Sequence, residues 1–455
     1  MRPVLTPEEM GAVDAAAPEP VEVLIGRAGA AVAREALAML GGAYGRRVVV
    51  VAGKGNNGND GRDAARRLRR RGVRVQVVEA ADAPERLPAG DLVIDAAYGT
   101  GFRGEYDPPD PAGAPVLAVD IPSGVDGLTG RVAGRAVRAD RTVTFAALKP
   151  GLLFHPGRAL AGEVVVADIG LDVSGARLGL VEAADVAAWF PARPADSHKW
   201  RAAVVLAAGS PGMTGAAHLA ARAALRAGAG MVRVAIPGLD HDAGLPTEAV
   251  GIPVPPAGWD TQVLEQLDRA GALVLGPGLG RAAPTEAAVH QVARSAAVPT
   301  VIDGDGLTAL GEQARERLAP RRAPAVLTPH DGEFARLAGH APGDDRVAAA
   351  RALAATTTAV VLLKGPTTVV AHPGGRACLS TTGDARLATA GTGDVLSGVV
   401  GALLAQGIEP LAAAAAGAWL HGRAALAGPA RGLVASDLVD ALPVALAALD
   451  DAGAG

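Results

Sequence analysis

The stretch Ala390–Gly398 (AGTGDVLSG) is the most informative segment of this chain and lies in its C-terminal half. Its small residues Gly391–Gly393 come just before a helix predicted over Val395–Gln406. Unpaired backbone N–H groups and the positive end of a helix dipole make such a turn an anion site. The carboxylate of Asp394 could deprotonate a hydroxyl while these amides hold a phosphoryl group. The alternative is a tight turn with a glycine C-cap and an aspartate N-cap.

Outward from this turn, short Val- and Ile-rich runs alternate with helical stretches. In the first half, strands are expected at Arg46–Ala52, Val73–Glu79, Leu92–Ala96, Val116–Ile121, Thr142–Ala146 and Val164–Ile169. In the second half, they are expected at Ala202–Ala208, Met231–Ile236, Leu273–Leu275, Thr300–Asp303, Ala325–Thr328 and Val360–Lys364. Helices are expected near residues 20–40, 60–71 and 215–227, and in three Ala-rich stretches between 395 and 449. The alternation predicts an α/β fold with parallel sheets covered on both faces.

The join between the two series is predicted at Phe190–Lys199 (FPARPADSHK), which is Pro-rich and polar. The sequence therefore predicts two domains, residues 1–190 and 198–455. A chain of 455 residues in which half of the residues are apolar can bury large cores.

Composition excludes several classes of function. The net charge of −4 gives no sign of nucleic-acid binding, and no apolar run reaches the roughly 18 residues of a membrane span. The single cysteine, Cys378, fits a reducing compartment. The start of the chain has no hydrophobic segment of the kind that secretory signals carry. We therefore expect a cytoplasmic protein with no nucleic-acid or membrane partner.

Basic residues are almost all arginine, and lysine is kept only at Lys54, Lys149, Lys199 and Lys364. Each lies in or beside a Gly-rich or motif-like stretch. A compact ammonium can reach phosphate oxygens where a guanidinium fork does not fit. Chance survival on the surface is the alternative, above all for Lys199.

The segment Gly53–Gly61 (GKGNNGNDG) follows the first strand and contains G-x-G-x-x-G, with Glu79 at the end of the next strand. This is the dinucleotide fingerprint, and it defines one rival interpretation, a nicotinamide-dependent oxidoreductase. Three Asn and one Asp add nothing to a pyrophosphate cradle, so the loop fits better as the floor of a site for a polar ligand, with or without a cation. A polar turn capped by Asn or Asp is the alternative.

Polar side chains also follow the next strands. Asp95 ends one strand, and Asp120 and Ser123 follow another. Carboxyl ends of parallel strands line one crevice. With Asn57, these residues could supply hard oxygen ligands to K⁺, Mg²⁺ or Ca²⁺. An isolated Asp at a strand end can instead cap a helix.

These motifs resemble two known families. The first half resembles the NAD(P)H-hydrate epimerase family in GNNGNDG, in the D-x-x-x-G-T-G loop from Asp95 and in VDIPSG. The second half resembles the ADP-dependent NAD(P)H-hydrate dehydratase family, which has a ribokinase-like fold. Its matching pieces are Gly209–Ala216, Gly276–Gly280, Leu327–Glu333, Lys364–Gly365 and Gly391–Asp394. The resemblance implies an N-terminal Rossmann-like three-layer domain and a C-terminal ribokinase-like domain in a homo-oligomer.

The dehydratase resemblance implies that the second domain phosphorylates the hydroxyl of a hydrated nicotinamide with ADP and eliminates phosphate, giving NAD(P)H and AMP. Asp394 would be the base. The anion hole would be formed by Gly391, Thr392 and Gly393. ADP would be bound by Lys364, Gly365, Pro366, Thr367, Thr368 and Gly393. NAD(P)H-hydrate would contact Ala216, Gly278, His330 and Asp394. Mg²⁺ would accompany the nucleotide, held by Asp303 and Asp305 unless these only form a turn, and His330 could instead be part of a helix cap.

The epimerase resemblance implies that the first domain interconverts the R and S epimers. Substrate would be bound by Asn56, Asn57, Gly58, Asn59, Asp60, Gly99, Thr100, Gly101, Phe102, Arg103, Gly104, Glu105 and Asp120. K⁺ would be ligated by Asn57, Asp95 and Ser123, and Asp120 would handle the proton. Lys149 has no implied role beyond a possible phosphate contact.

The chain departs from these families at three positions. Asn59 stands where the epimerase motif has Gly, and we expect it in a turn with its side chain near the ligand. Asp331 replaces a Pro, and Met213 replaces an aromatic residue. Two alternatives stay open: a ribokinase-like small-molecule kinase, and a first half that binds without catalysis.

Overall fold

The computed structural model describes residues 1–191, 195–239 and 244–452. Two compact units make up the chain, one formed by Arg2–Leu178 and the other by Gly179–Gly455 together with Met1. The sequence placed the join later, at Phe190–Lys199, of which residues 192–194 lie outside the described ranges. Helix α5 (Ala183–Trp189) counts with the C-terminal unit because it packs on α14 and α15.

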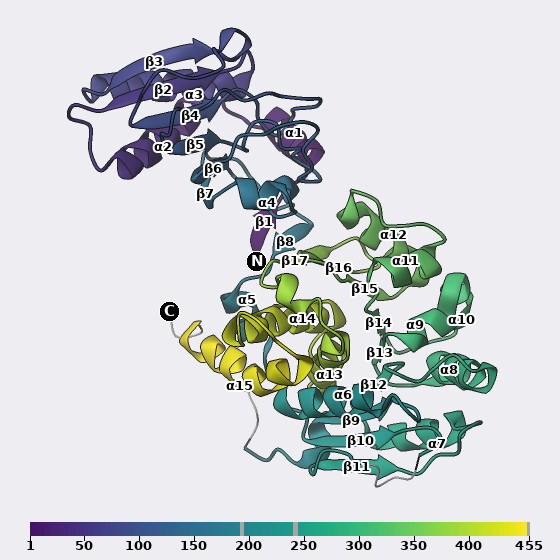
Figure 1. Cartoon of the computed structure of the whole chain (residues 1–455). Coiled ribbons are helices and arrows are strands. Elements are labelled where there is room, and N and C mark those ends of the chain that lie inside the picture. The colour runs from purple at the N-terminus through teal and green to yellow at the C-terminus, as the bar shows by residue number, and fades with distance from the viewer. Residues whose placement is uncertain (192–194, 240–243, 453–455) are drawn as a thin grey trace. The chain divides into compact units, whose positions relative to one another are not determined.

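The N-terminal unit is built on a six-stranded parallel sheet in the order β3-β2-β4-β5-β6-β7 (Figure 1). These strands are β2 (Arg47–Ala52), β3 (Arg74–Glu79), β4 (Leu92–Ala96), β5 (Val116–Val119), β6 (Arg141–Phe145) and β7 (Glu163–Ala167). The unit also contains β1 (Arg2–Val4), α1 (Pro7–Ala15), α2 (Val21–Leu40), α3 (Asn56–Arg70) and α4 (Gly157–Leu160). All six strands of the sheet correspond to predicted strands.

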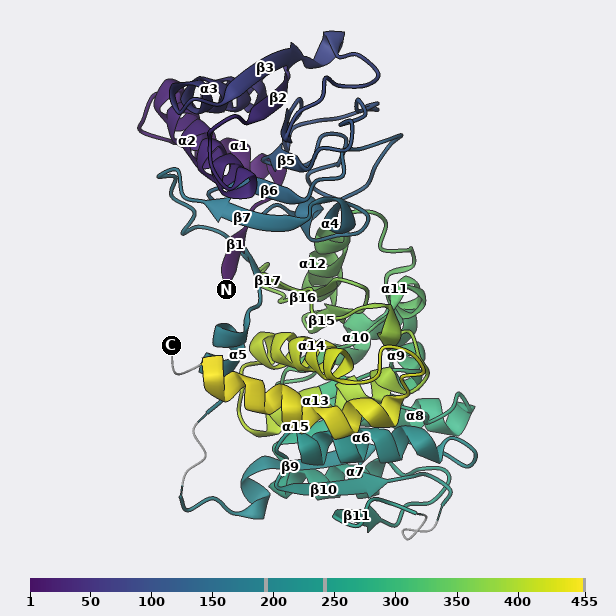
Figure 2. The ribbon, with the colours of Figure 1, turned by 60° about the vertical axis from the view of Figure 1, so that its left-hand side comes forward.

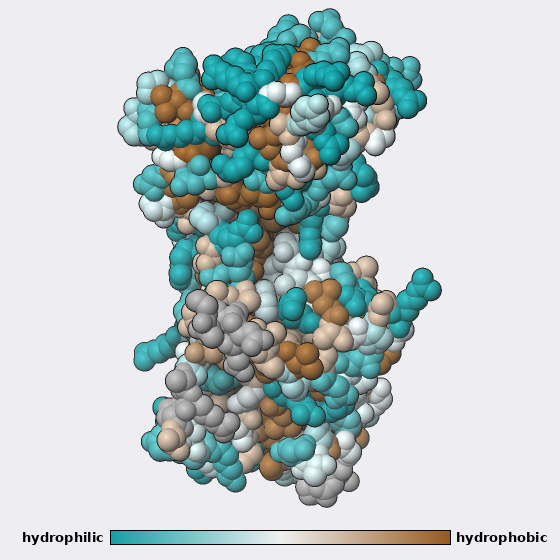
Figure 3. Space-filling view, turned by 90° about the vertical axis from the view of Figure 1, so that its left-hand side faces the viewer, coloured by the Kyte–Doolittle hydropathy of each residue, from teal (hydrophilic) through white to brown (hydrophobic). Residues whose placement is uncertain are grey.

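Helices α2 and α3 bury their small and aliphatic residues against one face of this sheet. Tyr98 and Tyr106, from the segment after β4, pack with Val49, Val51 and Val93 in a second apolar cluster. On the face drawn in Figure 3, this unit presents mostly hydrophilic residues, with hydrophobic ones in smaller areas between them. The N-terminal core therefore lies between the sheet and its helices.

The C-terminal unit contains a larger sheet in which nine strands run in the order β17-β16-β15-β14-β13-β12-β9-β10-β11, with β8 beside β17. The strands are β8 (Leu178–Leu180), β9 (Ala203–Ala207), β10 (Met231–Ala235), β11 (Ala249–Ile252), β12 (Ala272–Leu275), β13 (Thr300–Ile302), β14 (Ala325–Leu327), β15 (Val360–Leu363), β16 (Thr368–Ala371) and β17 (Ala377–Ser380). From β11 to β15 the pairs are parallel, and β16 pairs antiparallel with both β15 and β17. The sequence did not predict this antiparallel edge.

Helices cover both faces of that sheet (Figures 1 and 2). One layer holds α6 (Thr214–Arg226), α13 (Thr392–Ala405), α14 (Pro410–Ala427) and α15 (Ala435–Ala452), which pack on one another. The other holds α7 (Asp260–Glu265), α8 (Ala283–Ser295), α9 (Asp305–Leu310), α10 (Ala314–Leu318), α11 (Asp331–Ala338) and α12 (Arg346–Thr357). The α/β class is confirmed in both units.

Three local differences from the sequence expectations bear on the sites. Helix α1 was not predicted, although Thr6 and Glu9 form a capping box at its start. Helix α3 begins at Asn56 rather than near Asp60, so residues 56–60 are its first turns and not a loop. The expected turn at Asn59 is therefore wrong, because that residue is helical. Within the described ranges, no helix is both long and apolar enough to cross a membrane.

Candidate active sites

A cavity of about 710 Å³ opens in the C-terminal unit at the carboxyl ends of β13, β14 and β15. Carboxyl ends of parallel strands commonly carry ligand sites. Its walls include residues from three strand ends and from the start of α13, namely Asp303, Gly304, His330, Lys364, Gly365, Pro366, Thr368, Gly391, Thr392, Gly393 and Asp394. The structure therefore brings most of the predicted dehydratase residues into one cavity.

Asp394 lies in the first turn of α13, just after the N-cap residue Gly391. The pKa of Asp394 is raised to about 7, mainly by burial and next by the charge of Asp303, while Lys364 acts in the opposite direction. A carboxyl with a pKa near neutrality can both take and give a proton at ordinary pH. Asp394 therefore has the properties of a general base.

The turn before α13 depends on glycine at position 391. Its φ of +87° is in the left-handed region, and a Cβ there would lie 2.6 Å from Cδ1 of Leu219. The hydroxyl of Thr392 donates to the carbonyls of Leu387 and Thr389 at 2.8 and 2.9 Å, and its amide donates to Thr389 O at 3.4 Å. Thr392 thus anchors the turn, and Gly391 and Gly393 are the better candidates for amides that face an anion.

Lys364 is held in an ionic network at the base of the same cavity. Its Nζ lies 3.0 Å from Oδ1 of Asp303 and 3.4 Å from Oε2 of Glu333. The hydroxyls of Thr328 and Ser397 donate to the two oxygens of Asp303 at 2.7 and 2.8 Å. Burial acts to raise the pKa of Asp303, but the ammonium and the hydroxyls hold it below its usual range. Asp303 is therefore an anion, and each of its two oxygens already accepts at least one hydrogen bond.

His330 caps the N-terminus of α11. Its Nδ1 accepts from the amides of Gly332 and Glu333 at 3.0 and 3.3 Å, and the Glu333 carboxylate accepts from the His330 amide at 2.9 Å. The capping alternative is therefore present, and the ring also borders the cavity. Asp305 accepts from the amide of Gly280 and from Arg281, which fits the turn alternative for that residue.

Besides Asp305, three predicted dehydratase residues do not line this cavity: Ala216, Gly278 and Thr367. Ala216 and Gly278 lie against each other, since a Cβ on Gly278 would be 2.8 Å from Cβ of Ala216. Thr367 is buried, and the cavity wall passes from Pro366 to Thr368.

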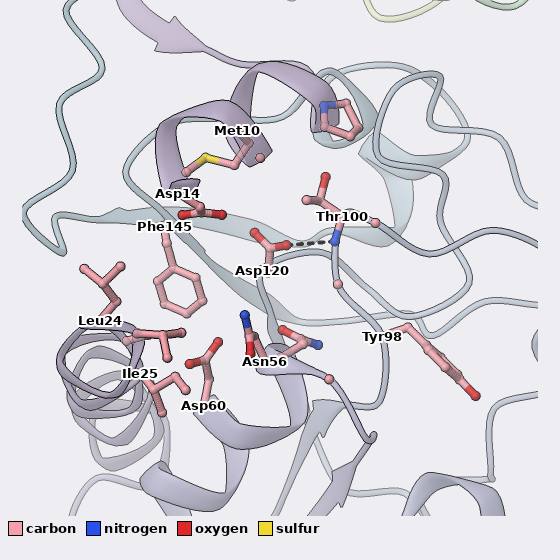
Figure 4. Close-up of a pocket in the computed structure, with 18 of the residues that line it drawn as sticks. Met10, Asp14, Leu24, Ile25, Asn56, Asp60, Tyr98, Thr100, Asp120 and Phe145 are labelled. Carbon is pink, nitrogen blue, oxygen red and sulfur yellow. Dashed lines mark hydrogen bonds between the residues drawn. The ribbon is translucent and has the colours of Figure 1, made fainter. Parts of the chain in front are cut away.

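A second cavity, of about 640 Å³, lies in the N-terminal unit (Figure 4). Eight of the predicted epimerase residues line it: Asn56, Asn57, Asp60, Gly99, Thr100, Gly101, Phe102 and Asp120. The other five, Gly58, Asn59, Arg103, Gly104 and Glu105, are not among its lining residues. Asn59, whose side chain the sequence placed near the ligand, lies on helix α3 and is not among the residues that line the cavity.

Asp120 sits just beyond β5 with φ of +68°, a conformation that costs a non-glycine residue roughly 1–2 kcal/mol. Its Oδ2 accepts from the amide of Thr100 at 2.8 Å (Figure 4), and its Oδ1 lies 2.8 Å from Nζ of Lys149. Burial acts to raise the pKa of Asp120, but Lys149 and the hydrogen bonds lower it. The carboxylate is therefore an anion held in a strained and fixed position.

Two of the three predicted K⁺ ligands, Asp95 and Ser123, are in direct contact. Both oxygens of Asp95 are bonded to Ser123, through the hydroxyl at 2.7 Å and the amide at 2.8 Å. The side-chain amide of Asn57 is buried and has no hydrogen-bond partner among the described residues. An orphaned buried amide is unusual without a ligand. The side-chain oxygens of Asn57 and Ser123 suit a hard monovalent cation. Asp95 could bind the same cation only through oxygens that already accept hydrogen bonds from Ser123.

Sequence reasoning missed Asp14 and His421, two titratable residues that line the cavities. Asp14 reaches the N-terminal cavity from α1, and no local signal marks it (Figure 4). Lys149 lines the same cavity, and the scarcity of lysine did single it out. His421, on α14, lines the C-terminal cavity; burial lowers its pKa to about 4. The dinucleotide interpretation gains no support, because Glu79 pairs with Arg62 at 2.5 Å and is not a lining residue.

Models of known protein families match both halves of the chain. A family model described as NAD(P)H-hydrate dehydratase matches residues 204–443. A second, described as YjeF-related protein N-terminus, matches residues 21–90 and 79–151. The C-terminal cavity lies within the first match, and most of the residues that line the N-terminal cavity lie within the second.

Similar full-length proteins carry both parts. The chain is 41% identical over 469 residues to the bifunctional NAD(P)H-hydrate repair enzyme Nnr of Salinibacter ruber, covering 87% of this chain and 86% of that protein. It is 36% identical to the Escherichia coli protein of the same name, with 87% and 84% covered.

A solved structure supports the C-terminal fold. The ADP/ATP-dependent NAD(P)H-hydrate dehydratase of Bacillus subtilis, co-crystallised with ATP and Mg²⁺, superposes with a TM-score of 0.52 at 31% identity. It covers 60% of this chain and 98% of its own. The chain belongs to the bifunctional NAD(P)H-hydrate repair enzyme family.

Proposed function

We propose that this chain repairs hydrated nicotinamide cofactors. Its C-terminal unit would dehydrate the S form of NAD(P)H-hydrate at the expense of ADP, and its N-terminal unit would interconvert the R and S forms. The observation that carries the proposal is the meeting of Asp394, the glycine turn before it and Lys364 in one cavity. A proton acceptor, an anion site and a buried ammonium are the parts that phosphoryl transfer needs.

In the dehydratase step, the Asp394 carboxylate would take the proton of the substrate hydroxyl. The hydroxyl oxygen would form a bond to the terminal phosphoryl group of ADP as the bond to AMP breaks. The amides of Gly391 and Gly393 would stabilise the charge on the moving group. Phosphate would then leave the ring carbon, and loss of a proton from the neighbouring carbon would restore the double bond of the reduced cofactor.

The residues of the C-terminal cavity do not form a dedicated Mg²⁺ site. Asp303 is engaged by Lys364, Thr328 and Ser397, and Glu333 by Lys364 and the His330 amide. No group of three metal-binding side chains occurs in the part of the chain that the structure describes. Mg²⁺ commonly keeps several waters and is bound largely through substrate phosphates. We infer that any Mg²⁺ enters with the nucleotide.

In the N-terminal unit, Asn57, Asp95 and Ser123 would hold K⁺, which would supply a fixed positive charge for the ligand. The orphaned amide of Asn57 supports this assignment. The cytoplasmic location and the homo-oligomeric state stay predictions.

A direct assay tests the proposal. Purified protein is given a mixture of R and S NADH-hydrate with ADP. We expect the reduced-nicotinamide absorbance to recover completely, with AMP and phosphate appearing in equal amounts. Recovery of the R form faster than the epimers equilibrate in buffer requires both activities, because a dehydratase specific for S leaves the R form behind. A ribokinase-like kinase with a non-catalytic first domain would instead leave a stable phosphorylated product, and that result would contradict the proposal.

A further inference from the structure

Lys149 is a buried ammonium in the wall of the N-terminal cavity, and its side chain is only 1% exposed. Its Nζ donates to Oγ1 of Thr144 at 2.8 Å and to the carbonyl of Phe145 at 3.0 Å. The third neighbour is Oδ1 of Asp120, at 2.8 Å. An ammonium has three N–H donors, so these three acceptors use all of them. Lys149 therefore has no donor left for a phosphate, which argues against the contact expected from the sequence.

What Lys149 does instead is fix Asp120. Besides the ammonium, Oδ1 faces the Thr144 hydroxyl at 3.3 Å, and Oδ2 takes the Thr100 amide. These contacts hold a carboxylate at the cavity wall on a backbone that would otherwise relax from its left-handed conformation. A buried carboxylate next to a buried ammonium stays ionised.

Asp60 is the opposite case in the same cavity. It projects from the second turn of α3 and is 7% exposed, and among the residues that the structure describes it has no ion pair or hydrogen bond to its side chain. Figure 4 shows its carboxyl directed into the cavity that Asp14 and Asp120 also face. A buried carboxyl without a cationic partner favours its neutral form. The pKa of Asp60 is raised to about 8, mainly by burial and also by the charges of Asp120, Asp63 and Asp14.

We propose that Lys149 and Thr144 are positioning residues that hold Asp120 as the base of the epimerase site, and that Asp60 is its acid. The inference rests on the proposed epimerase function and adds residue roles to it. One cavity then presents an ionised and a protonated carboxyl, which is how environment can divide acid and base roles between two like residues.

The reaction balances without a redox partner. Asp60 gives its proton to the ring hydroxyl, the carbon–oxygen bond breaks, and water leaves while the ring-nitrogen lone pair stabilises the cationic carbon. Water then adds to the opposite face, forms a new carbon–oxygen bond and passes its proton to Asp120. Exchange through water returns the proton from Asp120 to Asp60. The product is the other epimer.

The test uses the full chain and pure R NADH-hydrate. ADP is left out so that the dehydratase does not turn over, and the two epimers are followed by chromatography. We expect Asp60→Asn and Asp120→Asn each to lower kcat by ~10²–10⁴-fold with little change in KM. Lys149→Met should also lower kcat, but adding it to Asp120→Asn should cost little more. Lys199→Met, which changes an exposed lysine of the other unit, is the control with wild-type kcat.

The pH profile gives a readout that loss of structure would not. The other charged groups that line this cavity or act on Asp60 are Asp14 on α1, Asp63 on α3, and Glu19, Lys54, Lys149 and Asp120. Wild-type kcat/KM should fall above about pH 8 as Asp60 loses its proton, and Asp60→Asn should remove that alkaline limb. Thr144→Val, a nearly isosteric change, should lower kcat less than Lys149→Met and in the same direction.

Correct folding of the N-terminal unit in each variant is checked by hydrogen exchange of peptides from β2 and β4, which should match that of the wild type, and the dehydratase rate on S NADH-hydrate with ADP checks the other unit. Wild-type kcat in Lys149→Met would overturn the positioning role. So would an equal loss from Lys149→Met with and without Asp120→Asn. An alkaline limb that persists in Asp60→Asn overturns the role of Asp60. If the wild type equilibrates the epimers no faster than buffer, the epimerase proposal itself falls, and this inference with it.

Discussion

The ammonium of Lys364 lies 3.0 Å from Oδ1 of Asp303, and the two residues come from the ends of strands β15 and β13. This pair connects two strand ends beneath the turn that carries Asp394. A Cβ on Gly393 would lie 3.6 Å from Nζ of Lys364 and 3.7 Å from Oδ2 of Asp303. The Lys364 ammonium that would bind the phosphates is thus held in place by the same ion pair that orders the floor of the cavity.

Lys364→Met should damage both binding and stability. Removing the ammonium leaves the Asp303 carboxylate buried with hydroxyl partners alone, and breaking such a pair typically costs about 3–5 kcal/mol. We expect a higher KM for ADP, a lower kcat for dehydration and a lower free energy of unfolding in urea. Lys199→Met is the matched control, since that lysine is exposed and lines neither cavity. Unchanged ADP affinity in Lys364→Met would contradict the assignment.

The dehydratase rate should depend on pH through Asp394. Because the pKa of this carboxyl is about 7, its basic form is lost as pH falls through that value. We expect kcat/KM for S NADH-hydrate to decrease about tenfold per pH unit below about pH 7. Asp394→Asn should lower the rate by ~10²–10⁴-fold and flatten this limb.

The control for Asp394 is Asp440→Asn, which changes an exposed carboxylate that pairs with Arg222. It should keep the wild-type rate and profile. A full rate in Asp394→Asn would show that another group accepts the proton.

The turn before α13 offers a test at its glycine. Gly391→Ala forces a left-handed alanine and places a methyl group against Leu219, so we expect a loss of dehydratase kcat as the amides shift. Gly407→Ala is a sharp control, because Gly407 has a similar φ of +85° just after the other end of the same helix, with nothing within 4 Å of the added Cβ. Both variants carry the backbone strain, and only Gly391→Ala should lose activity beyond its loss of stability.

The parallel-sheet pattern predicted much of this site, for a physical reason. Asp95 and Asp120 lie at or just past strand ends of the N-terminal sheet, and Asp303 lies just past a strand end of the C-terminal sheet. The carboxyl ends of the parallel strands in each sheet meet at one edge of that sheet. Val- and Ile-rich runs show where such strands end. The geometry of the sheet then brings residues distant in sequence together without any further information.

The remaining site residues could not be found in this way. Asp14 reaches the cavity because α1 folds over it, and no sequence period states where that helix docks. The sequence placed Asn59 in a turn because α3 starts at Asn56 after the N-cap residue Gly55, which has no side chain to mark the start of a helix. The role of Lys149 depends on its three acceptors, and only the folded chain shows them.

Asp60 and Asp63 allow a final test on stability, because two buried carboxyls of one helix differ in their partners. Asp63 pairs with Arg66 and Arg67 at 2.6 and 2.5 Å, whereas Asp60 has no such partner among the described residues. The folded-state pKa of Asp60, about 8, lies above its ordinary value of 3.8. The folded chain therefore keeps a proton that the unfolded chain has released, and stability decreases as pH rises between these two values.

Asp60→Asn should accordingly stabilise the N-terminal unit near pH 8, and this gain should vanish as pH falls toward about 4. Asp63→Asn should destabilise it instead, because the variant loses two ion pairs. Hydrogen exchange of peptides from β2 and β4 reports on this unit, and fluorescence of Trp189, Trp200, Trp259 and Trp419 reports on the other. Equal destabilisation by both substitutions at every pH would mean that the folded protein holds Asp60 as a paired anion, and its assignment as the acid would have to be withdrawn.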